Sequence, residues 1–528
     1  MADLVHELLF DSAARNPRNE ALVFQGSRLD YSALAEAASA GAAALLRLGL
    51  GRAERVGVFL EKRPETVVAL FAAAAAGAVF VPINPVLKPP QVVHILKDCN
   101  VRILVTSQER LAFLAPVLKG CPDLRAVLLV GRSGAPAAPE AVELVDWNEA
   151  CSRGRPPRAH RAIDTDMAAI LYTSGSTGLP KGVVLSHRNI AAGARSVAGY
   201  LGNRESDRIL AALPLSFDAG FSQLTTAFLV GASVTLHNYL LPRDLLRTVE
   251  HERITGLTAV PPLWIQLSHL DWTLGGKHLR YIANTGGRMP KATLDTLHGA
   301  LPHAKIFLMY GLTEAFRSTY LAPEELDRRP DSIGKAIPNA EVMVVREDGS
   351  RCAPGEPGEL VHRGALVSLG YWNDPQKTAE RFKPAPGQPE GLVLPEIAVW
   401  SGDTVAMDEE GFLYFIGRRD EMIKTSGYRV SPTEVEEALY ATGLVAEAAA
   451  FGLPHPEIGQ EIVVVATSRD GAPLDAGALI AACRPRLPAF MLPARIIVRE
   501  GCLPRNPNGK IDRQSLAQEM ASELGAAA

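Results

Sequence analysis

Cysteine is scarce in this sequence of 528 residues, and its pattern argues against two common ways of stabilising a protein. The chain has six cysteines, and no two of them form a Cys-x-x-Cys pair. Disulfide frameworks and zinc sites usually need cysteines at close or regular spacing, so both are disfavoured. We therefore expect reduced thiols, in a cytoplasmic protein, at Cys99, Cys121, Cys151, Cys352, Cys483 and Cys502.

A large excess of charge of one sign is also missing. The formal net charge is −4, which gives no indication of a nucleic-acid partner. The N-terminus has acidic residues early and lacks an apolar core flanked by basic residues, so it does not resemble a signal peptide. The uncharged stretch Thr66–Leu87 contains Gly77, two prolines and much weakly apolar alanine. We expect no membrane span there, but a buried helix followed by a strand at Ala78–Ile83.

Two nucleotide-binding signatures are absent as well. A Walker A loop needs a glycine directly before its lysine, but Pro180 precedes Lys181. No Gly-x-Gly-x-x-Gly pattern follows an early predicted strand. These absences exclude a nucleotide-binding protein of the Walker type and a Rossmann dehydrogenase.

The sequence does contain long alternations of helix and strand patterns. A chain of 528 residues predicts two or more domains. Residues 1 to about 160 and again 160–340 alternate helical stretches with short apolar strands, which predicts an α/β fold with mainly parallel sheet. Residues 341–420 are richer in β patterns. We predict a large N-terminal domain (1–419) of α/β subdomains plus a β-rich subdomain, and a small α+β C-terminal domain (420–528).

The individual elements can be placed by their patterns. The predicted strands are Val56–Leu60, Val79–Ile83, Ile103–Val105, Ala126–Val130, Met167–Tyr172, Val183–Leu185, Glu341–Val345, Gly358–His362, Phe412–Ile416, Ala448–Gly452 and Ile462–Thr467. The predicted helices include Tyr31–Leu48, Asn189–Leu201, Thr433–Tyr440 and Leu474–Arg484.

The most informative segment is Leu171–Gly182, which reads LYTSGSTGLPKG. Hydroxyl side chains and glycines crowd around one lysine, Lys181. Glycine lets backbone N–H groups approach oxygen atoms closely, and hydroxyls add further donors. A loop of this kind at the end of a strand suits a polyphosphate better than a structural hairpin.

This segment resembles the phosphate-binding loop of the adenylate-forming enzymes, a superfamily of acyl-CoA synthetases, luciferases and adenylation domains of peptide synthetases. Four further segments, with His187 and Gly77–Pro85, follow the order and spacing of that family, so the resemblance covers nearly the whole chain. It implies that ATP is bound through Thr173, Ser174, Gly175, Ser176, Thr177, Gly178 and Lys181.

The segments Met309–Glu314 and Trp400–Asp403 carry the next part of the resemblance. They imply that Tyr310 stacks on adenine, that Thr313 contacts the α-phosphate and that Glu314 binds Mg²⁺, which prefers hard oxygen ligands. Asp403, which by itself reads as a turn residue, is implied to accept both ribose hydroxyls. An ionised carboxylate only accepts hydrogen bonds and therefore suits a vicinal diol.

The charged segment 417–429 would ordinarily be a solvated face, but it resembles the family's hinge between domains. The resemblance implies that Arg418 contacts ribose and phosphate and that Asp420 is the pivot. Lys424 is implied in the second half-reaction, and the backbone at Gly427 approaches the channel of the thiol acceptor.

The segment Asn506–Arg513 would by default carry a surface lysine, yet it resembles the family element that supplies the catalytic lysine of adenylation, here Lys510. Attack of a carboxylate on the α-phosphorus builds negative charge on the phosphoryl oxygens and on the departing pyrophosphate. A cation placed against both stabilises the transition state more than the ground state.

The resemblance implies a reaction in two steps. A small carboxylic or amino acid reacts with ATP and Mg²⁺ to give an acyl-adenylate; the mobile small domain then rotates, and a thiol attacks the adenylate. The thiol belongs to coenzyme A or to the phosphopantetheine arm of an acyl carrier protein. Such a carrier is expected to act in trans, because no Asp-Ser-Leu element follows Lys510. The alternatives are a coenzyme A ligase for an ordinary fatty or aryl acid and, less favoured, an inactive nucleotide-binding homologue.

The acyl pocket is expected to include Phe217, Asp218, Ser222, Gly286, Gly287, Met309 and Arg317. A Phe-Asp pair in amino-acid adenylation domains holds the substrate's ammonium group, so Asp218 points to an amine-bearing substrate. Equally, Asp218 could cap the helix after it.

Arg317 stands where the family often has a small residue. It could clamp a second carboxylate or a phosphate, face solvent, or pair with Asp218. If both side chains face the cavity, the pocket suits a small, doubly charged acid. The surrounding segments also resemble a subgroup of bacterial acyl-CoA ligases associated with exosortases.

Overall fold

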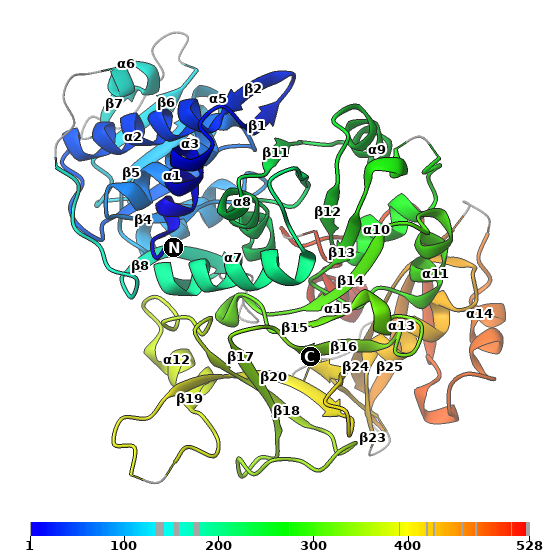
Figure 1. Cartoon of the computed structure of the whole chain (residues 1–528). Coiled ribbons are helices and arrows are strands. Elements are labelled where there is room, and N and C mark those ends of the chain that lie inside the picture. The colour runs from blue at the N-terminus through cyan, green and yellow to red at the C-terminus, as the bar shows by residue number, and fades with distance from the viewer. Residues whose placement is uncertain are drawn as a thin grey trace.

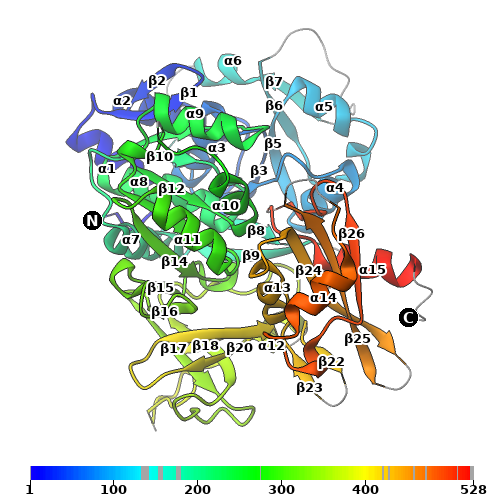
Figure 2. The same ribbon diagram turned by 90° about the vertical axis from the view of Figure 1, so that its right-hand side faces the viewer.

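The computed structural model shows a large α/β body and a smaller C-terminal unit beside it (Figures 1 and 2). It describes residues 2–131, 142–152, 158–173, 180–273, 275–389, 391–418, 421–425, 428–455, 458–469, 473–507 and 509–523.

The first sheet is formed by residues from the first 190 positions, in the order β7-β6-β5-β3-β4-β8-β9. Its neighbouring strands run parallel, except for the antiparallel pair β8 and β9. This confirms the predicted mainly parallel sheet. The strands are β3 (Arg55–Phe59), β4 (Val79–Pro82), β5 (Val101–Ser107), β6 (Ala126–Val130), β7 (Glu143–Asp146), β8 (Met167–Thr173) and β9 (Lys181–Ser186).

The second sheet has more strands than the first, and its strand pairing changes from parallel to antiparallel across the sheet. Strands β1, β11, β10, β12, β13 and β14 run parallel, whereas the strands from β14 to β17 pair antiparallel. The antiparallel half is the β-rich part expected at 341–420. The strands are β1 (Glu20–Phe24), β2 (Ser27–Asp30), β10 (Arg208–Ala211), β11 (Ser233–Leu236), β12 (Gly256–Ala259), β13 (Tyr281–Asn284), β14 (Lys305–Tyr310), β15 (Thr319–Leu321), β16 (Ser332–Ala336), β17 (Ala340–Val345), β18 (Gly358–Gly364), β19 (Phe382–Pro384), β20 (Ile397–Met407) and β21 (Leu413–Arg418).

A layer of helices lies between the two sheets and shares one apolar core with both (Figure 1). This layer contains α3, whose residues from Thr66 to Ala74 are buried. The expected buried helix is therefore confirmed, and no described helix is both long and apolar enough to cross a membrane. The helices of the layer are α1 (Val5–Arg15), α2 (Tyr31–Arg47), α3 (Pro64–Ala75), α7 (His187–Leu201) and α8 (Asp218–Val230).

Shorter helices cover the outer faces of the two sheets. Residues of α4 and α5 share an apolar cluster with the first sheet, and residues of α9, α10 and α11 share another with the second. The bounds are α4 (Pro89–Asp98), α5 (Gln108–Leu114), α9 (Pro242–His251), α10 (Pro261–Ser268) and α11 (Lys291–Ala300). Two further short helices are α6 (Trp147–Ser152), which contacts α2, and α12 (Pro375–Arg381), which contacts β20.

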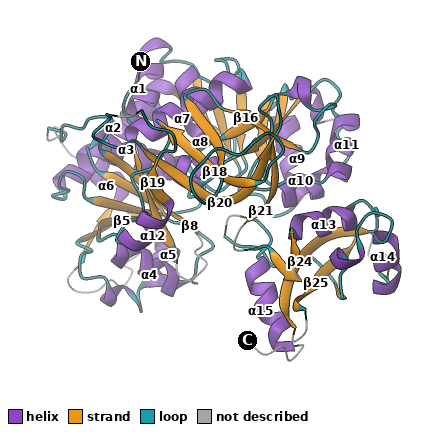
Figure 3. Ribbon diagram, turned by 90° about the horizontal axis from the view of Figure 1, so that it is seen from below, coloured by secondary structure: helices purple, strands orange, loops and turns teal. Residues whose placement is uncertain are grey.

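The C-terminal unit has cores of its own on both faces of a small sheet (Figure 3). Alternate residues of β24 point to α13 and α14 on one face, as Ala448 and Ala450 do, and to α15 on the other, as Ala449 and Phe451 do. The elements are β22 (Ile423–Thr425), β23 (Tyr428–Val430), α13 (Pro432–Tyr440), β24 (Val445–His455), β25 (Gly459–Ser468), α14 (Ala476–Cys483), β26 (Arg495–Arg499) and α15 (Arg513–Glu523).

The boundary expected between residues 419 and 420 lies outside the described residues and stays a prediction. The expectation of free thiols is confirmed, because all six cysteines are free.

Candidate active site

The predicted phosphate loop begins and ends on two paired strands. Thr173 closes β8 and lies opposite Lys181, the first residue of β9. Ser174, Gly175, Ser176, Thr177 and Gly178 lie outside the described residues. The Thr173 hydroxyl oxygen is buried, and no described residue makes a hydrogen bond with it. A ligand at the loop could supply that partner.

Lys181 and Glu314 form a group of three with Tyr371. The Nζ atom of Lys181 lies 3.4 Å from Glu314 Oε1 and 2.9 Å from the Tyr371 hydroxyl, which itself donates to Glu314 Oε1 over 2.6 Å. Burial works to raise the pKa of Glu314, but Lys181 and Tyr371 outweigh it and leave the pKa below its usual value. Glu314 is therefore an ionised, half-buried carboxylate beside the end of the phosphate loop.

Tyr310, Asp403 and Arg418 form a second group. Asp403 on β20 lies opposite Arg418 on β21, and their Oδ1 and Nε atoms are 3.1 Å apart. The Tyr310 hydroxyl, at the end of β14, donates to Asp403 Oδ2. Burial raises the pKa of Asp403, while Arg418 and the Tyr310 hydroxyl oppose that rise. The structure thus brings together the three residues that the sequence assigns to the nucleoside.

Lys510 reaches this region from the C-terminal unit. Its Cε atom lies 3.0 Å from the position that a Cβ atom would take on Gly286, whose φ of +79° favours glycine. Burial lowers the pKa of Lys510, while the charges of Asp218 and Asp403 oppose that shift. Lys510 therefore interacts electrostatically with two carboxylates, Asp218 of the predicted acyl pocket and Asp403 of the predicted ribose site.

Asp218 and Arg317 are joined by a buried ion pair. Arg317 Nη1 lies 2.6 Å from Asp218 Oδ2, and the two side chains are 3% and 4% exposed. The Thr313 hydroxyl donates to Asp218 Oδ1 over 3.2 Å. Of the alternatives for Arg317, the structure shows pairing with Asp218.

The helix-cap alternative for Asp218 is not what the structure shows. Asp218 is the first residue of α8, the cap position is Phe217, and no side chain caps the helix. A negative charge in the first helical turn is nevertheless stabilised by the helix dipole. The preceding turn packs tightly on this helix end, since a Cβ atom on Gly220 would lie 1.8 Å from the Pro214 carbonyl oxygen.

A strained turn brings Arg317 into the interior. The short helix Thr313–Ala315 ends at Phe316, which has φ of 56° and is completely buried. A non-glycine residue at positive φ costs free energy and is retained only where the surroundings hold it. The Phe316 ring fills the space beside Gly193, and its carbonyl accepts a hydrogen bond from Arg317 Nη1 over 2.9 Å.

The other predicted pocket residues are placed as follows. Phe217, Ser222 and Met309 are buried, and Gly287 is exposed next to Gly286. Ser222 lies one helical turn after Asp218, and its hydroxyl has no hydrogen-bond partner among the described residues. Met309 Sδ accepts a hydrogen bond from the Tyr200 hydroxyl over 2.9 Å.

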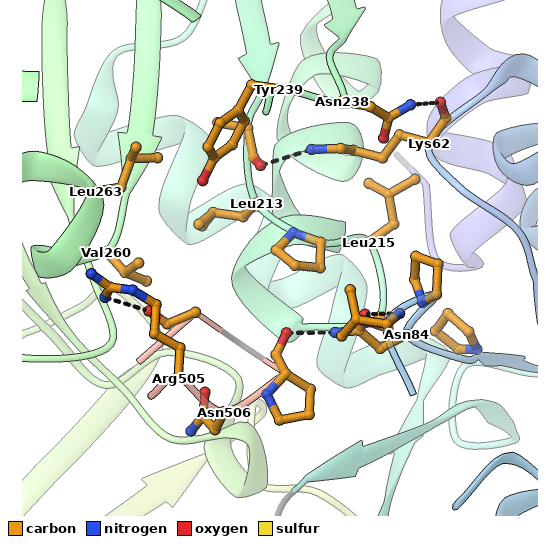
Figure 4. Close-up of a pocket in the computed structure, with 18 of the residues that line it drawn as sticks. Lys62, Asn84, Leu213, Leu215, Asn238, Tyr239, Val260, Leu263, Arg505 and Asn506 are labelled. Atoms are coloured by element: carbon orange, nitrogen blue, oxygen red, sulfur yellow. Dashed lines mark hydrogen bonds between the residues drawn. The ribbon is translucent and has the colours of Figure 1, made fainter. Parts of the chain in front are cut away.

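A cavity of about 380 Å³ lies against the segment Leu213–Ser216 (Figure 4). Its walls are largely apolar, with amide groups from Asn84, Asn238 and Gln266, and they do not include Asp218 or Arg317. Arg505, Asn506, Pro507 and Gly509 form one wall of it, and Asn84 Nδ2 donates to the Pro507 carbonyl over 2.6 Å. This cavity therefore lies between the large body and the loop that carries Lys510.

Lys62, which also lines the cavity, was not singled out in the sequence. Its Nζ donates to the Ala211 and Ala212 carbonyls over 3.0 and 2.7 Å, and burial lowers its pKa to about 7. Tyr371 was missed as well, because an uncharged residue in a Gly-Tyr-Trp-Asn stretch carries no pattern that points to Glu314.

Three predicted functional positions are not tested by the contacts that the structure describes. Asp420 and Gly427 lie outside the described residues. Lys424 is exposed on β22, where its backbone N–H donates to Gln460 Oε1 over 2.7 Å. The role of Lys424 in the second half-reaction stays a prediction.

The chain was compared with known protein families. Residues 9–372 match the family model described as AMP-binding enzyme, and residues 434–510 match the model of the AMP-binding enzyme C-terminal domain. The chain therefore belongs to the AMP-binding enzyme family, the adenylate-forming superfamily that its motifs resemble.

Relatives and solved structures agree with this assignment. The chain is 32% identical to an L-proline–[L-prolyl-carrier protein] ligase of Pseudomonas fluorescens, over 98% of this chain and 99% of that protein. It is 30% identical to an indoleacetate–CoA ligase of Aromatoleum aromaticum, over 96% of each chain. The structure of ATP-bound MatB from Rhodopseudomonas palustris has a TM-score of 0.86 and 26% identity, over 98% of this chain and 99% of that one.

Some relatives are far longer than this chain. It spans only 6% and 10% of the length of two linear gramicidin synthase polypeptides of Brevibacillus parabrevis, at 29% identity to each. What those large proteins assemble is therefore not carried over to this chain.

Proposed function

We propose that this chain is an AMP-forming ligase. A carboxylate attacks the α-phosphorus of ATP, which gives an acyl-adenylate and releases pyrophosphate. A thiol then attacks the acyl carbon, which gives a thioester and releases AMP. The observation that carries the proposal is the position of Lys510, which lies against Gly286 and interacts electrostatically with Asp218 and Asp403.

The residues around the predicted phosphate loop fit a triphosphate and Mg²⁺. Lys181 and the unpartnered Thr173 hydroxyl supply a cation and a donor for the phosphates. No cluster of three metal-binding side chains occurs in the part of the chain that the structure describes. In this proposal Glu314, phosphate oxygens and water would hold the Mg²⁺ ion, and such an ion neutralises phosphate charge.

The nucleoside binds at Tyr310 and Asp403 in this proposal. A diol that displaces the Tyr310 hydroxyl from Asp403 Oδ2 finds an acceptor already held by Arg418. The released tyrosine ring is then free to stack on adenine.

Lys510 then serves as the catalytic lysine. It lies between the acid and the nucleotide, where charge develops on the phosphoryl oxygens. Because it comes from the C-terminal unit, it leaves when that unit rotates about Asp420, and Lys424 takes part in the second step.

We further infer that the thiol acceptor's arm enters through the cavity beside Leu213–Ser216. A pantetheine arm consists of methylene groups and amides, and the cavity offers apolar walls with the amides of Asn84, Asn238 and Gln266. Rotation of the C-terminal unit would withdraw Arg505, Asn506, Pro507 and Gly509 from the cavity wall and open this space.

The proposal is tested by acid-dependent exchange of radiolabelled pyrophosphate into ATP, with amino acids, short fatty acids, aryl acids and dicarboxylates. Exchange that needs one of these acids supports the ligase, and its absence with every acid contradicts it. Coenzyme A and a phosphopantetheinylated carrier protein are then compared as acceptors. Leu263→Trp, in the cavity wall, should block thioester formation with either acceptor but leave exchange unchanged.

A second candidate is a coenzyme A ligase for an ordinary aryl or fatty acid. The similarity to the indoleacetate–CoA ligase over nearly the full length favours it. Exchange with phenylacetate or hexanoate that is insensitive to neutralising Asp218 and Arg317 together would support this candidate instead.

A further inference from the structure

We propose that Asp218 and Arg317 together select an aminodicarboxylic acid, whose ammonium group pairs with Asp218 and whose second carboxylate pairs with Arg317. This inference rests on the proposed function and deepens it, because it names the class of acid that the ligase activates. In the ion pair that the structure shows, the Arg317 guanidinium lies where the ammonium group would bind Asp218, and the Asp218 carboxylate lies where the second carboxylate would bind Arg317.

The ion pair lies at the reaction centre and not at a remote point of the core. Asp218 accepts a hydrogen bond from Thr313, the neighbour of Glu314. Its charge also acts on Lys510. One substrate molecule could therefore place its ammonium group at Asp218 and its reacting carboxylate beside Lys510.

The pair leaves polar groups without partners, which is unusual for a structural ion pair. Arg317 is 2% exposed, yet its Nε makes no hydrogen bond with any described residue. Ser222 is 3% exposed, and its hydroxyl likewise finds no partner there. Buried donors of this kind are normally satisfied by protein, water or ligand, so in the predicted acyl pocket they offer hydrogen bonds to the acceptor atoms of a substrate.

The charges decide which ligand fits. Asp218 and Arg317 balance each other now, with Nη1 and Oδ2 2.6 Å apart. An ordinary amino acid brings one ammonium group, which would compete with Arg317 and leave one buried cation uncompensated. A simple dicarboxylic acid would leave one buried anion uncompensated.

An acid that carries both groups avoids this penalty. Its ammonium group replaces Arg317 at Asp218, and its second carboxylate takes the guanidinium, including the unpartnered Nε. Two ion pairs then replace one, and every charge keeps a partner. A planar guanidinium is well suited to bind a carboxylate through two nitrogens.

The test uses stable mimics of the acyl-adenylate, in which a sulfamate replaces the phosphate. Four acids with the same carbon skeleton are each linked to 5′-O-sulfamoyladenosine: butanoate, 2-aminobutanoate, butanedioate and 2-aminobutanedioate. A matching five-carbon series allows for a longer pocket. Calorimetric titration of the full chain gives Kd for each compound without requiring turnover.

In one of the two series, the analogue with both groups should bind at least about tenfold more tightly than each of the other three. If the amino, dicarboxyl or unsubstituted analogue binds as tightly, or if all bind equally, the inference is wrong while the adenylate-binding function stands. If no analogue binds, the proposed function itself fails, and the inference fails with it.

A double variant tests the residues. Asp218→Asn/Arg317→Met removes both charges without leaving either one alone, and it should bind the unsubstituted analogue best. The exposed pair Lys291 and Asp295 provides the matched control, since Asp295→Asn/Lys291→Met should keep the wild-type order. A double variant that still prefers the doubly substituted analogue would contradict the assignment.

Discussion

Arg317 and Asp218 are separated by 99 positions in the chain, yet their side chains meet at 2.6 Å in a place where neither is more than 4% exposed. Such a pair is held together by the low polarity around it and would be costly to break from one side. The free energy of unfolding should therefore respond very differently to single and to paired substitutions.

Arg317→Met should destabilise the protein by about 3–5 kcal/mol, because it leaves the Asp218 carboxylate buried without its cation. Asp218→Asn/Arg317→Met should recover most of that loss. Urea unfolding measures both. As a control, Lys291→Met in the exposed pair with Asp295 should cost at most about 0.5 kcal/mol. A double variant no more stable than Arg317→Met would show that the two residues act independently.

Asp403→Asn should weaken nucleotide binding through the ribose. An amide accepts with only one of its two polar atoms, so one hydroxyl contact to a charged group is lost, worth about 1.5–3 kcal/mol. The Kd for ATP should rise accordingly, and the preference for ATP over 2′-deoxyATP should shrink. The exposed Asp295→Asn is the control. An unchanged preference in Asp403→Asn would place the ribose elsewhere.

Two buried histidines should make the protein less stable in mild acid. Burial lowers the pKa of His187 and of His362 to about 4, from an ordinary value of 6.5. Between these pH values the unfolded chain binds more protons than the folded one, so stability is lost as pH falls from 7 toward 4. Each histidine should cost about 2 kcal/mol by pH 5.

The measurement is the urea midpoint as a function of pH. His187→Asn and His362→Asn should each flatten the dependence, whereas His298→Asn, at an exposed position, should not. If all three variants follow the wild-type curve, the two buried histidines do not control acid stability.

Much of the fold follows from local patterns in the sequence. Short apolar runs such as Ala126–Val130 form strands with the predicted bounds, and the predicted helix Asn189–Leu201 is found with two more residues at its start. The hairpin of β1 and β2 was not predicted, because β2 is short and polar and β1 pairs with β11, about 210 positions away. Pairing at such sequence distance leaves no local signal.

The site shows the same division. The family resemblance assigned Lys181 and Glu314 to the phosphates and Mg²⁺, and Tyr310, Asp403 and Arg418 to the nucleotide, and the structure brings the residues of each group together. The roles of these residues remain predictions. The sequence left the role of Asp218 open, with pairing to Arg317 as one alternative, since a Phe-Asp pair gives the same signal whether its carboxylate caps a helix, binds an ammonium group or pairs with an arginine. Burial of Arg317 by the strained turn at Phe316 decides between them.

The variant Lys510→Ala tests most directly whether Lys510 catalyses adenylation, because it should impair the first half-reaction and spare the second. Acid-dependent pyrophosphate exchange should fall at least about 10²-fold, because the cation beside the α-phosphate is lost. ATP binding should remain measurable, and thioester formation from a synthetic acyl-adenylate should continue. Lys277→Ala, on the surface, should match the wild type in all three assays. Exchange by Lys510→Ala near the wild-type rate would contradict the proposed mechanism.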